Sequence, residues 1–578
     1  MTIFQRAWFC SLYVANVLCE NLHWGCRYEM GCNMIDEKVE EILNYLSKAK
    51  KNSYISQIDI IYAEELDKEM ESASKEKKDL WCEQLMDELS DGNPYMVVFW
   101  YSMLVFVNKD GKLFNRYAQY ILDNNHFFPI ETRYFLFYQL KAAMFMHKIY
   151  ETKESQILVW KLILDIIEEY QKILEVDLSY IPKEQRNDNL YLVITEQMLV
   201  EQHGPTKTAL DRCKVIMDKL GKEVLLIDTA EILSMVGRIP IYRSNQSNYN
   251  EDLLEVDTIP WKGANVPYYQ CENNMPNIGE LNKLLSIIRS FSPARIVSIG
   301  GSSVLSGLAN KMVPVVSIGL CPSDFEYTAS TFQTLGRKLD DKDRFILDKL
   351  MLPQTHVIES IFTSSLKPQT EHISRADMQI DDNAFAMCVV GGRLDVEVSD
   401  EFLNMLEELI ISAPDEKLDA NVPGGTTDET MDAIVPDTPD IQIVFLGRFD
   451  TYDRMVSKYP AVKEHSKFLG FCDDILSRME NIDLYVNPIR KGGGTSCVEA
   501  MSKGVPVVTV NYGDVSVNVG DAFCVESYDE MKTTIKKYMT DKSFYAKMSA
   551  CAIKRTEILL DTEGAFVKIL EEADTREK

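Results

Sequence analysis

The stretch "NPIRKGGGTSCVEAMSKGVPVVT", residues 487–509, places three consecutive glycines directly after an arginine and a lysine and directly before a helical pattern. The preceding segment "IDLYVNP" (482–488) is apolar like a buried strand, and "VPVVTV" (505–510) is a second apolar run. This order predicts a βαβ unit of a parallel sheet, with the glycines in the turn at the carboxyl end of the first strand. Open α/β sheets bind their ligands at that end.

The residue types in this turn suit an anionic ligand. Glycine lets backbone N–H groups approach an anion closely, and the helix N-terminus adds the positive end of its dipole. Hydroxyl groups can cap the helix, basic side chains add charge, and a carboxylate one turn later can accept hydrogen bonds from sugar hydroxyls. The alternative without a ligand is that the glycines only form a turn before a core helix, and that the carboxylate lies in solvent. The residues that we expect to bind a ligand are Arg490, Lys491, Gly492, Gly493, Gly494, Thr495, Ser496 and Glu499.

The same pattern extends along the chain on both sides of this turn. Strand-like runs at 384–395 and 441–450 flank a helical pattern, which predicts one Rossmann-like, doubly wound domain. An earlier series, beginning with the strand "NLYLVIT" (189–195) and followed by a helix and the strand "KEVLLIDTAE" (222–231), predicts a second one. We expect a cleft between the two domains. Residues 413–440 are rich in Asp, Pro, Gly and Thr and predict an acidic surface insertion.

A helical region precedes these domains. Apolar residues recur at three- and four-residue spacing from residue 34 to about 185, which predicts an all-α accessory domain. The first residues are either an extra helix or an over-extended start, with Met34 as the true beginning; the second alternative is slightly favoured. The predicted limits are 1–33 for an uncertain extension, 34–185 for the helical domain, 186–375 and 376–560 for the Rossmann-like domains, and 561–578 for a C-terminal helix or tail.

The composition limits the class of protein. The chain has 578 residues, too many for one core, and its hydrophobic and charged fractions of 46% and 26% are ordinary for a soluble protein. A formal net charge of -28 disfavours binding to nucleic acid or to an anionic membrane. The 13 cysteines include no C-x-x-C pair, which favours a reduced, cytoplasmic protein. No apolar run approaches the roughly 20 residues that cross a bilayer.

Two further strand ends carry arginines. "VVGGRLD" (389–395) contains Arg393, and "VFLGRFD" (444–450) contains Arg448. Either arginine can add positive charge to a ligand site at the end of its strand. A strand-end arginine is also often a surface ion-pair partner, and this alternative weighs more heavily for Arg448.

The earlier Rossmann-like domain offers weaker candidates. "EQHGPTKT" (201–208) places His203 in a loop between strand and helix, where it is a candidate general base near neutral pH. "SIGGSSVLSG" (298–307) places Gly300 and Gly301 after another strand, where they can line the cleft. An isolated loop histidine and a single Gly-Gly-Ser turn each carry little specificity.

Motifs for cofactors and metals are lacking. The sequence has neither the G-x-G-x-x-G fingerprint with a later acidic residue nor a G-x-x-x-x-G-K-[ST] motif, so it predicts neither an NAD site nor a P-loop. The histidines are dispersed. The D-x-D within "DDKDR" (340–344) follows no apolar strand and indicates a solvated helix face. We therefore predict no metal site and no bound cofactor.

The stretch "VEAMSKGVPVVT" (498–509) resembles the nucleotide-sugar site of the group 1 glycosyltransferases of GT-B fold, in which the motif E-x7-E-A-M-x-x-G-x-P-V-V follows the penultimate strand. In that family the second glutamate, which corresponds to Glu499, binds the ribose of the nucleotide. The resemblance also implies that Arg393 reaches the diphosphate. The first glutamate of the motif is replaced by Lys491, which puts a retaining mechanism in doubt and suits neutralisation of the leaving diphosphate.

The resemblance implies a metal-independent, cytoplasmic hexosyltransferase of GT-B fold that uses a nucleotide-sugar, with UDP the favoured nucleotide. Arg393, Lys491 and the glycine amides would stabilise the leaving diphosphate, and His203 would be the base. The helical domain weakly favours a protein acceptor over a glycan. The rival hypothesis is a non-catalytic GT-B-like subunit that binds an acceptor or a partner glycosyltransferase. The sugar, the stereochemical outcome and the oligomeric state stay open.

Overall fold

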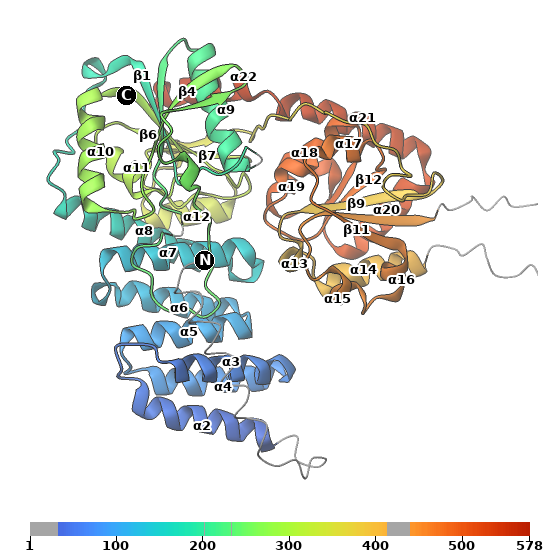
Figure 1. Cartoon of the computed structure of the whole chain (residues 1–578), viewed down its shortest axis with the longest axis horizontal. Helices are drawn as coiled ribbons and strands as arrows, with labels where there is room; N and C mark the ends of the chain where they lie inside the picture. Colours follow the sequence, from blue (N-terminus) through green and yellow to red (C-terminus); the bar gives the residue numbers. More distant parts are fainter. Residues whose placement is uncertain (1–32, 202, 233, 413–439, 578) are drawn as a thin grey trace, which may run out of the picture. The chain divides into compact units, whose positions relative to one another are not determined.

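The computed structural model describes residues 33–201, 203–232, 234–412 and 440–577 (Figure 1). They form two compact units, 33–108 and 109–577. The predicted extension 1–33 lies almost entirely outside the described residues, and so does nearly all of the predicted insertion 413–440.

The first unit is all-helical, as the apolar spacing predicts. Its helices are α2 (Asn33–Ala49), α3 (Gln57–Ser72), α4 (Lys75–Leu89) and α5 (Pro94–Asn108). Most side chains of α5 are buried, because α3 and α4 both pack against it. Asp59 in the first turn of α3 is fully buried and accepts hydrogen bonds from the Ser56 backbone N–H and from Trp100 Nε1. This satisfied carboxylate fixes α3 to α5.

The helical region continues into the second unit, so the compact unit ends earlier than the predicted boundary at 185. Helices α6 (Gly111–Asp123), α7 (Ile130–Met146) and α8 (Lys153–Ile173) belong to the unit that holds both sheets. Trp160 of α8 donates from Nε1 to the backbone oxygen of Thr328 at 2.8 Å. Gln156 donates from Nε2 to Asp324 Oδ2 at 2.6 Å. These helices therefore form one wall of the first sheet domain.

The first sheet has the order β3-β4-β2-β1-β5-β6-β7-β8 and is parallel except for the β3–β4 pair. The strands predicted at 189–195, at 222–231 and before Gly300 correspond to β1, β2 and β5. The turn between β3 and β4 contains Lys262 and Gly263, both with positive φ, which is the geometry of a tight hairpin. The strands are β1 (Asn187–Thr195), β2 (Glu223–Asp228), β3 (Thr258–Trp261), β4 (Ala264–Gln270), β5 (Pro293–Ile299), β6 (Val315–Ile318), β7 (Phe332–Leu335) and β8 (Val357–Glu359).

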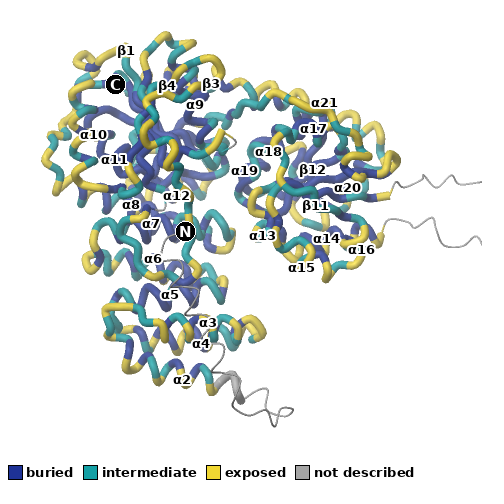
Figure 2. The backbone as a smooth tube through the Cα atoms, viewed as in Figure 1, coloured by how far each residue is buried: buried dark blue, intermediate teal, exposed yellow. Residues whose placement is uncertain are grey.

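The second sheet is fully parallel in the order β11-β10-β9-β12-β13-β14. Its central strands are buried from end to end, as Figure 2 shows, because helices cover both faces. The strands are β9 (Phe385–Gly391), β10 (Ile441–Gly447), β11 (Ser466–Gly470), β12 (Leu484–Asn487), β13 (Val507–Val510) and β14 (Cys524–Val525).

The helices of the two sheet domains connect successive strands. In the first domain they are α9 (Gly204–Asp218), α10 (Ile278–Phe291), α11 (Val304–Ala309) and α12 (Asp341–Leu350). In the second they are α13 (Leu394–Glu397), α14 (Asp400–Ile411), α15 (Tyr452–Val456), α16 (Pro460–His465), α17 (Ile475–Met479), α18 (Gly494–Ser502), α19 (Gly513–Val519), α20 (Tyr528–Thr540) and α21 (Lys542–Leu559). No helix within the described ranges is long and apolar enough to cross a membrane.

The segment "DDKDR" is only partly the solvated face that we predicted. Asp340 is the N-cap of α12 and accepts from the backbone N–H of Asp343 at 2.8 Å. Asp343 is fully buried because Arg337 pairs with it at 2.5 Å. The cluster of charges therefore starts a helix and anchors it.

The last helix, α22 (Thr562–Arg576), returns to the first sheet domain and packs against α9 and β8. Two buried arginines of that domain hold its end: Arg186 lies 2.7 Å from Glu577 Oε1, and Arg295 lies 2.6 Å from Glu577 Oε2. The predicted C-terminal tail is thus part of the first sheet domain.

Glu577→Ala leaves Arg186 without its carboxylate and Arg295 with Asp574 alone, so we expect a loss of about 3 kcal/mol in the free energy of unfolding. Urea unfolding measures this loss. Glu563→Ala on the same helix is the control, because its pair with Lys219 is exposed and its removal should change little. Equal stability of the two variants would contradict the anchoring role of Glu577.

Candidate functional site

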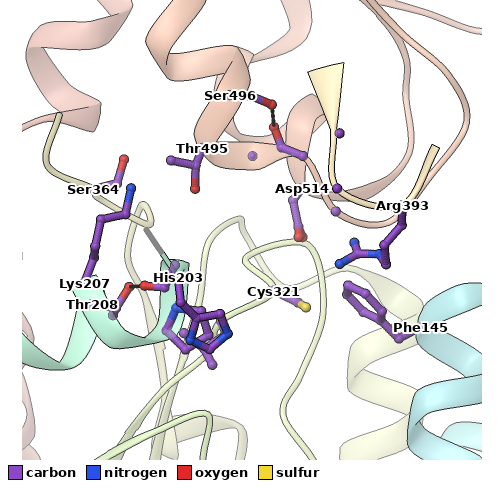
Figure 3. A pocket seen from close by; sticks show the side chains of 18 of the residues that line it. Phe145, His203, Lys207, Thr208, Cys321, Ser364, Arg393, Thr495, Ser496 and Asp514 are labelled. Atoms are coloured by element: carbon purple, nitrogen blue, oxygen red, sulfur yellow. Dashed lines mark hydrogen bonds between the residues drawn. The ribbon is translucent and has the colours of Figure 1, made fainter. Parts of the chain in front are cut away.

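A cavity of about 770 Å³ lies in the second unit and is lined by residues of both sheet domains and of α7 (Figure 3). The second domain contributes the turn 492–494, Thr495, Ser496, Glu499 and Arg393. The first contributes residues of α9, beginning with His203 and Gly204. Parallel strands of both sheets therefore direct their carboxyl ends toward one cavity.

The side chain of Arg490 packs against the Gly-rich turn and holds it in place through hydrogen bonds. The side chain of Arg490 is only 2% exposed, and four of its five N–H groups donate within the protein. Its guanidinium donates to Asn487 Oδ1 (2.8 Å), Val390 O (2.7 Å), Tyr485 Oη (2.9 Å) and Glu397 Oε2 (2.7 Å). Arg490 thus positions the turn, and little of its charge reaches the cavity.

The same guanidinium explains why glycine is required on either side of it. A Cβ atom on Gly493 would lie 2.5 Å from Arg490, and one on Gly391 would also lie 2.5 Å from it. Gly493 is the N-cap of α18 with a φ of 98°, a conformation that other residues rarely adopt. The backbone of the turn therefore lies bare beside the cavity.

Arg393 is the arginine that the structure places at the cavity with part of its surface open. Its side chain is 43% exposed, and its NH2 donates to Glu397 Oε1 at 2.9 Å. The guanidinium lies over the ring of Phe145 from α7, 4.9 Å from the ring centroid. Glu397 bridges Arg393 and Arg490, so the two arginines are held in a fixed relation.

The hydroxyl groups at the start of α18 differ in their availability. Ser496 Oγ lies 2.8 Å from Tyr485 Oη and donates to the backbone oxygen of Gly493. The hydroxyl of Thr495 makes no hydrogen bond with the described residues. Thr495 is therefore the hydroxyl that is ready to donate to a ligand.

Glu499 faces the cavity one turn into α18, as the sequence predicts. Burial raises the pKa of its carboxyl to about 7, against the opposing charges of Lys207 and Lys367. No side-chain hydrogen bond to the described residues satisfies this carboxyl. It is thus an acceptor without a protein donor.

His203 lines the opposite wall as the N-cap residue of α9. Its Nδ1 lies 3.0 Å from Thr206 Oγ1. Burial, with Lys207 nearby, lowers the pKa of the imidazole to about 4, so His203 is neutral at physiological pH. It can accept a proton from a reacting group only as a weak base.

Lys491 does not line the cavity. Its amine is buried and lies 2.9 Å from Asp324 Oδ2 and 3.3 Å from Glu151 Oε2. Both carboxylates belong to the first sheet domain and its helices, and they raise the pKa of Lys491 further above its usual value despite burial. The charge of Lys491 is therefore neutralised by carboxylates across the domain boundary. To stabilise a leaving group, as predicted, Lys491 would have to give up these ion pairs.

Three other sequence candidates also lie off the cavity. Arg448 is exposed, and only its backbone takes part in the turn, by donating to Gly391 O at 3.0 Å. Gly300 and Gly301 are buried against Glu196 and Ser317, which leave no open surface.

Sequence reasoning missed several cavity residues. Lys207 and Lys367 have no distinctive motif, and Phe145 lies in a helix that periodicity alone assigns to a core. Asp514 follows a predicted strand, and burial raises its pKa to about 7. Only the position of Asp514 after a parallel strand was a usable signal. No group of three or more potential metal ligands occurs in the described parts of the chain.

A comparison with protein families finds one match, which covers part of the chain. Residues 429–555 match the family described as glycosyl transferases group 1. The search of curated proteins found no match. This match covers the C-terminal part of the chain that includes "VEAMSKGVPVVT", where the sequence predicts the resemblance to group 1 glycosyltransferases.

One solved structure supports the fold, and others are similar to a lesser degree. A mutant of the Thermobaculum terrenum O-GlcNAc transferase is similar over 94% of this chain and 97% of that one, with 12% identity and a TM-score of 0.51. A glycosyltransferase from Rickettsia africae covers 68% of this chain and 100% of its own, with 10% identity and a TM-score of 0.46. HepE of Anabaena in complex with UDP covers 67% and 99%, with 15% identity and a TM-score of 0.44. The likeness to the first structure confirms the predicted GT-B fold.

Lys491→Met leaves Asp324 and Glu151 close together without their shared cation, so we expect a loss of roughly 3 to 5 kcal/mol in the free energy of unfolding. Urea unfolding at neutral pH measures this loss, and adding Asp324→Asn should restore part of it. Lys503→Met is the control, because its partner Glu480 lies at the surface and its loss should matter little. Unchanged stability together with lost turnover would instead favour a catalytic role.

Proposed function

We propose that the protein transfers a sugar from a nucleotide-sugar, with UDP as the nucleotide, to an acceptor hydroxyl or amide. The observation that carries the proposal is the bare N-terminus of α18 beside Arg393, in a cavity whose opposite wall belongs to the other domain. Amides of the turn 492–494, Thr495 and Arg393 would bind the diphosphate. Glu499 would accept hydrogen bonds from the ribose hydroxyls.

The reaction breaks the bond between the sugar C1 and the β-phosphate oxygen and forms a bond between C1 and the acceptor. Negative charge grows on the departing diphosphate, and donors fixed in a water-poor cavity stabilise it most as it develops. In this mechanism His203 accepts a hydrogen bond from the acceptor through Nε2, while Nδ1 donates to Thr206. The proposal includes no metal, because Arg393 and the helix N-terminus supply positive charge; activity should survive chelation by EDTA.

The acceptor is proposed to be a protein or a glycan. The helical unit 33–108 carries no cluster of residues with evident chemistry, which suits an accessory binding role. The Thermobaculum structure is an O-GlcNAc transferase, and the similarity covers 94% of this chain; this extent favours a protein acceptor in our proposal.

A panel of UDP, GDP, dTDP and CMP and of their sugar conjugates tests the function by thermal shift. We expect one nucleotide class, UDP, to raise the melting temperature, and Glu499→Ala to remove most of the shift because the ribose contact is lost. Slow release of free nucleotide from the matching sugar conjugate should accompany binding. Binding without hydrolysis or transfer would favour the non-catalytic subunit, and no shift with any nucleotide would reject the donor site.

Nucleotide affinity should decrease as the pH falls from about 8 to about 6. Burial raises the pKa of Glu499 to about 7, and its protonated form accepts fewer hydrogen bonds from ribose. Calorimetry at several pH values should also show proton release on binding. Asp514 titrates in the same range, so Glu499→Gln is the control: its affinity should be lower and nearly independent of pH. An equal pH slope in both proteins would exclude Glu499 as the titrating group.

A further inference from the structure

Helix α9 of the first sheet domain presents two cations, Lys207 and Arg212, to the cavity. Asp211 lines the cavity as well, but its carboxylate pairs with Lys262 at 2.7 Å. Arg212 is only 3% exposed, and its Nε and one terminal nitrogen have no hydrogen-bond partner among the described residues. Its second terminal nitrogen donates to the backbone oxygen of Thr363 at 3.0 Å. No carboxylate within the described residues forms an ion pair with this guanidinium.

Lys207, like Lys367, differs from Lys141 and Arg490 among the cations that line the cavity. Lys141 pairs with Glu326 at 3.0 Å, and Arg490 pairs with Glu397 at 2.7 Å. The amine of Lys207 is half-buried and has neither a hydrogen bond nor an ion pair within the part of the chain that the structure describes. A partly desolvated ammonium group without a partner favours an anionic ligand.

The side chain of Lys207 extends from α9 toward Ser364 and the side of the cavity that carries Thr495 (Figure 3). Lys207 also interacts electrostatically with Glu499, one helical turn behind Thr495. A ribose at Glu499 and a diphosphate at Thr495 place the α-phosphate between these two residues, because that phosphate links ribose to the rest of the diphosphate. The ammonium group of Lys207 faces this region from the opposite domain.

We propose that Lys207 binds the α-phosphate of the donor nucleotide from the first sheet domain, opposite the turn 492–494. This assignment rests on the proposed function. It makes the nucleotide a ligand of both domains, with Arg212 adding positive potential behind Lys207. It also implies that phosphate binding, and not nucleoside binding, favours the arrangement in which the two domains approach each other.

Uridine, UMP and UDP, measured by calorimetry, test the assignment. Lys207→Met should lower the affinity for UMP and UDP by about 10-fold or more, because it removes a charge-assisted contact with phosphate. The same substitution should change the affinity for uridine by less than about 2-fold. Lys207→Arg should retain most of the UMP affinity. Lys214→Met, on the same helix but paired with Asp218 and away from the cavity, should bind all three like the wild type.

Each other outcome has a distinct meaning. Equal weakening of uridine and UMP would overturn the assignment, because Lys207 would then act by keeping Glu499 ionised; Lys367→Met should show that pattern. Weakening of UDP alone would also overturn it, by moving the contact to the β-phosphate. If the wild type binds UMP and UDP and Lys207→Met binds them equally well, the inference fails while the proposed function stands. If the wild type binds none of the three, the proposed UDP site itself fails.

Discussion

The buried guanidinium of Arg490 is the interaction on which the candidate donor site depends. It ties the end of β9, through Val390, to β12 and to the turn that follows it. Through Glu397 it also fixes Arg393, the one arginine beside the turn with substantial exposed surface. The glycines on either side are consequences of this packing, since a side chain at Gly391 or Gly493 would overlap the guanidinium. A buried charge with four hydrogen bonds to the protein thus shapes a backbone surface that can bind another charge.

The neighbouring Lys491 connects the same turn to the first sheet domain. Its ion pairs with Asp324 and Glu151 join the turn to α8 and to the loop after β6, and Tyr512 donates to Glu151 at 2.9 Å beside them. Of the two cations next to the turn, Arg490 therefore pairs within the second sheet domain and Lys491 pairs with carboxylates of the first. Positive charge for a ligand must come from elsewhere, and Arg393 together with the α9 face provides it. An acidic chain can thus still present, at this cavity, cations that form no ion pair within the described residues, such as Lys207 and Lys367.

The fold was largely predictable because its signals are local. Parallel strands such as β9, β12 and β13 are continuous apolar runs. The Gly-rich turn can be located from its three consecutive glycines, which stand between a strand and a helix. The short β7 and β8 carry too few apolar residues to stand out, and the helical period of α7 and α8 does not say which domain they contact. In the site, the bare amides, Thr495 and Glu499 follow from the local sequence. The directions of Arg490 and Lys491 do not, since Glu397, Asp324 and Glu151 lie far away along the chain.

The return of α22 to the first sheet domain means that the polypeptide passes between the two sheet domains twice. The two passages touch: the backbone N–H of Ser364 donates to the backbone oxygen of Leu559 at 3.0 Å. The two crossings therefore limit together how far the two sheet domains can separate at this point, while the ion pairs of Lys491 hold the domains together elsewhere.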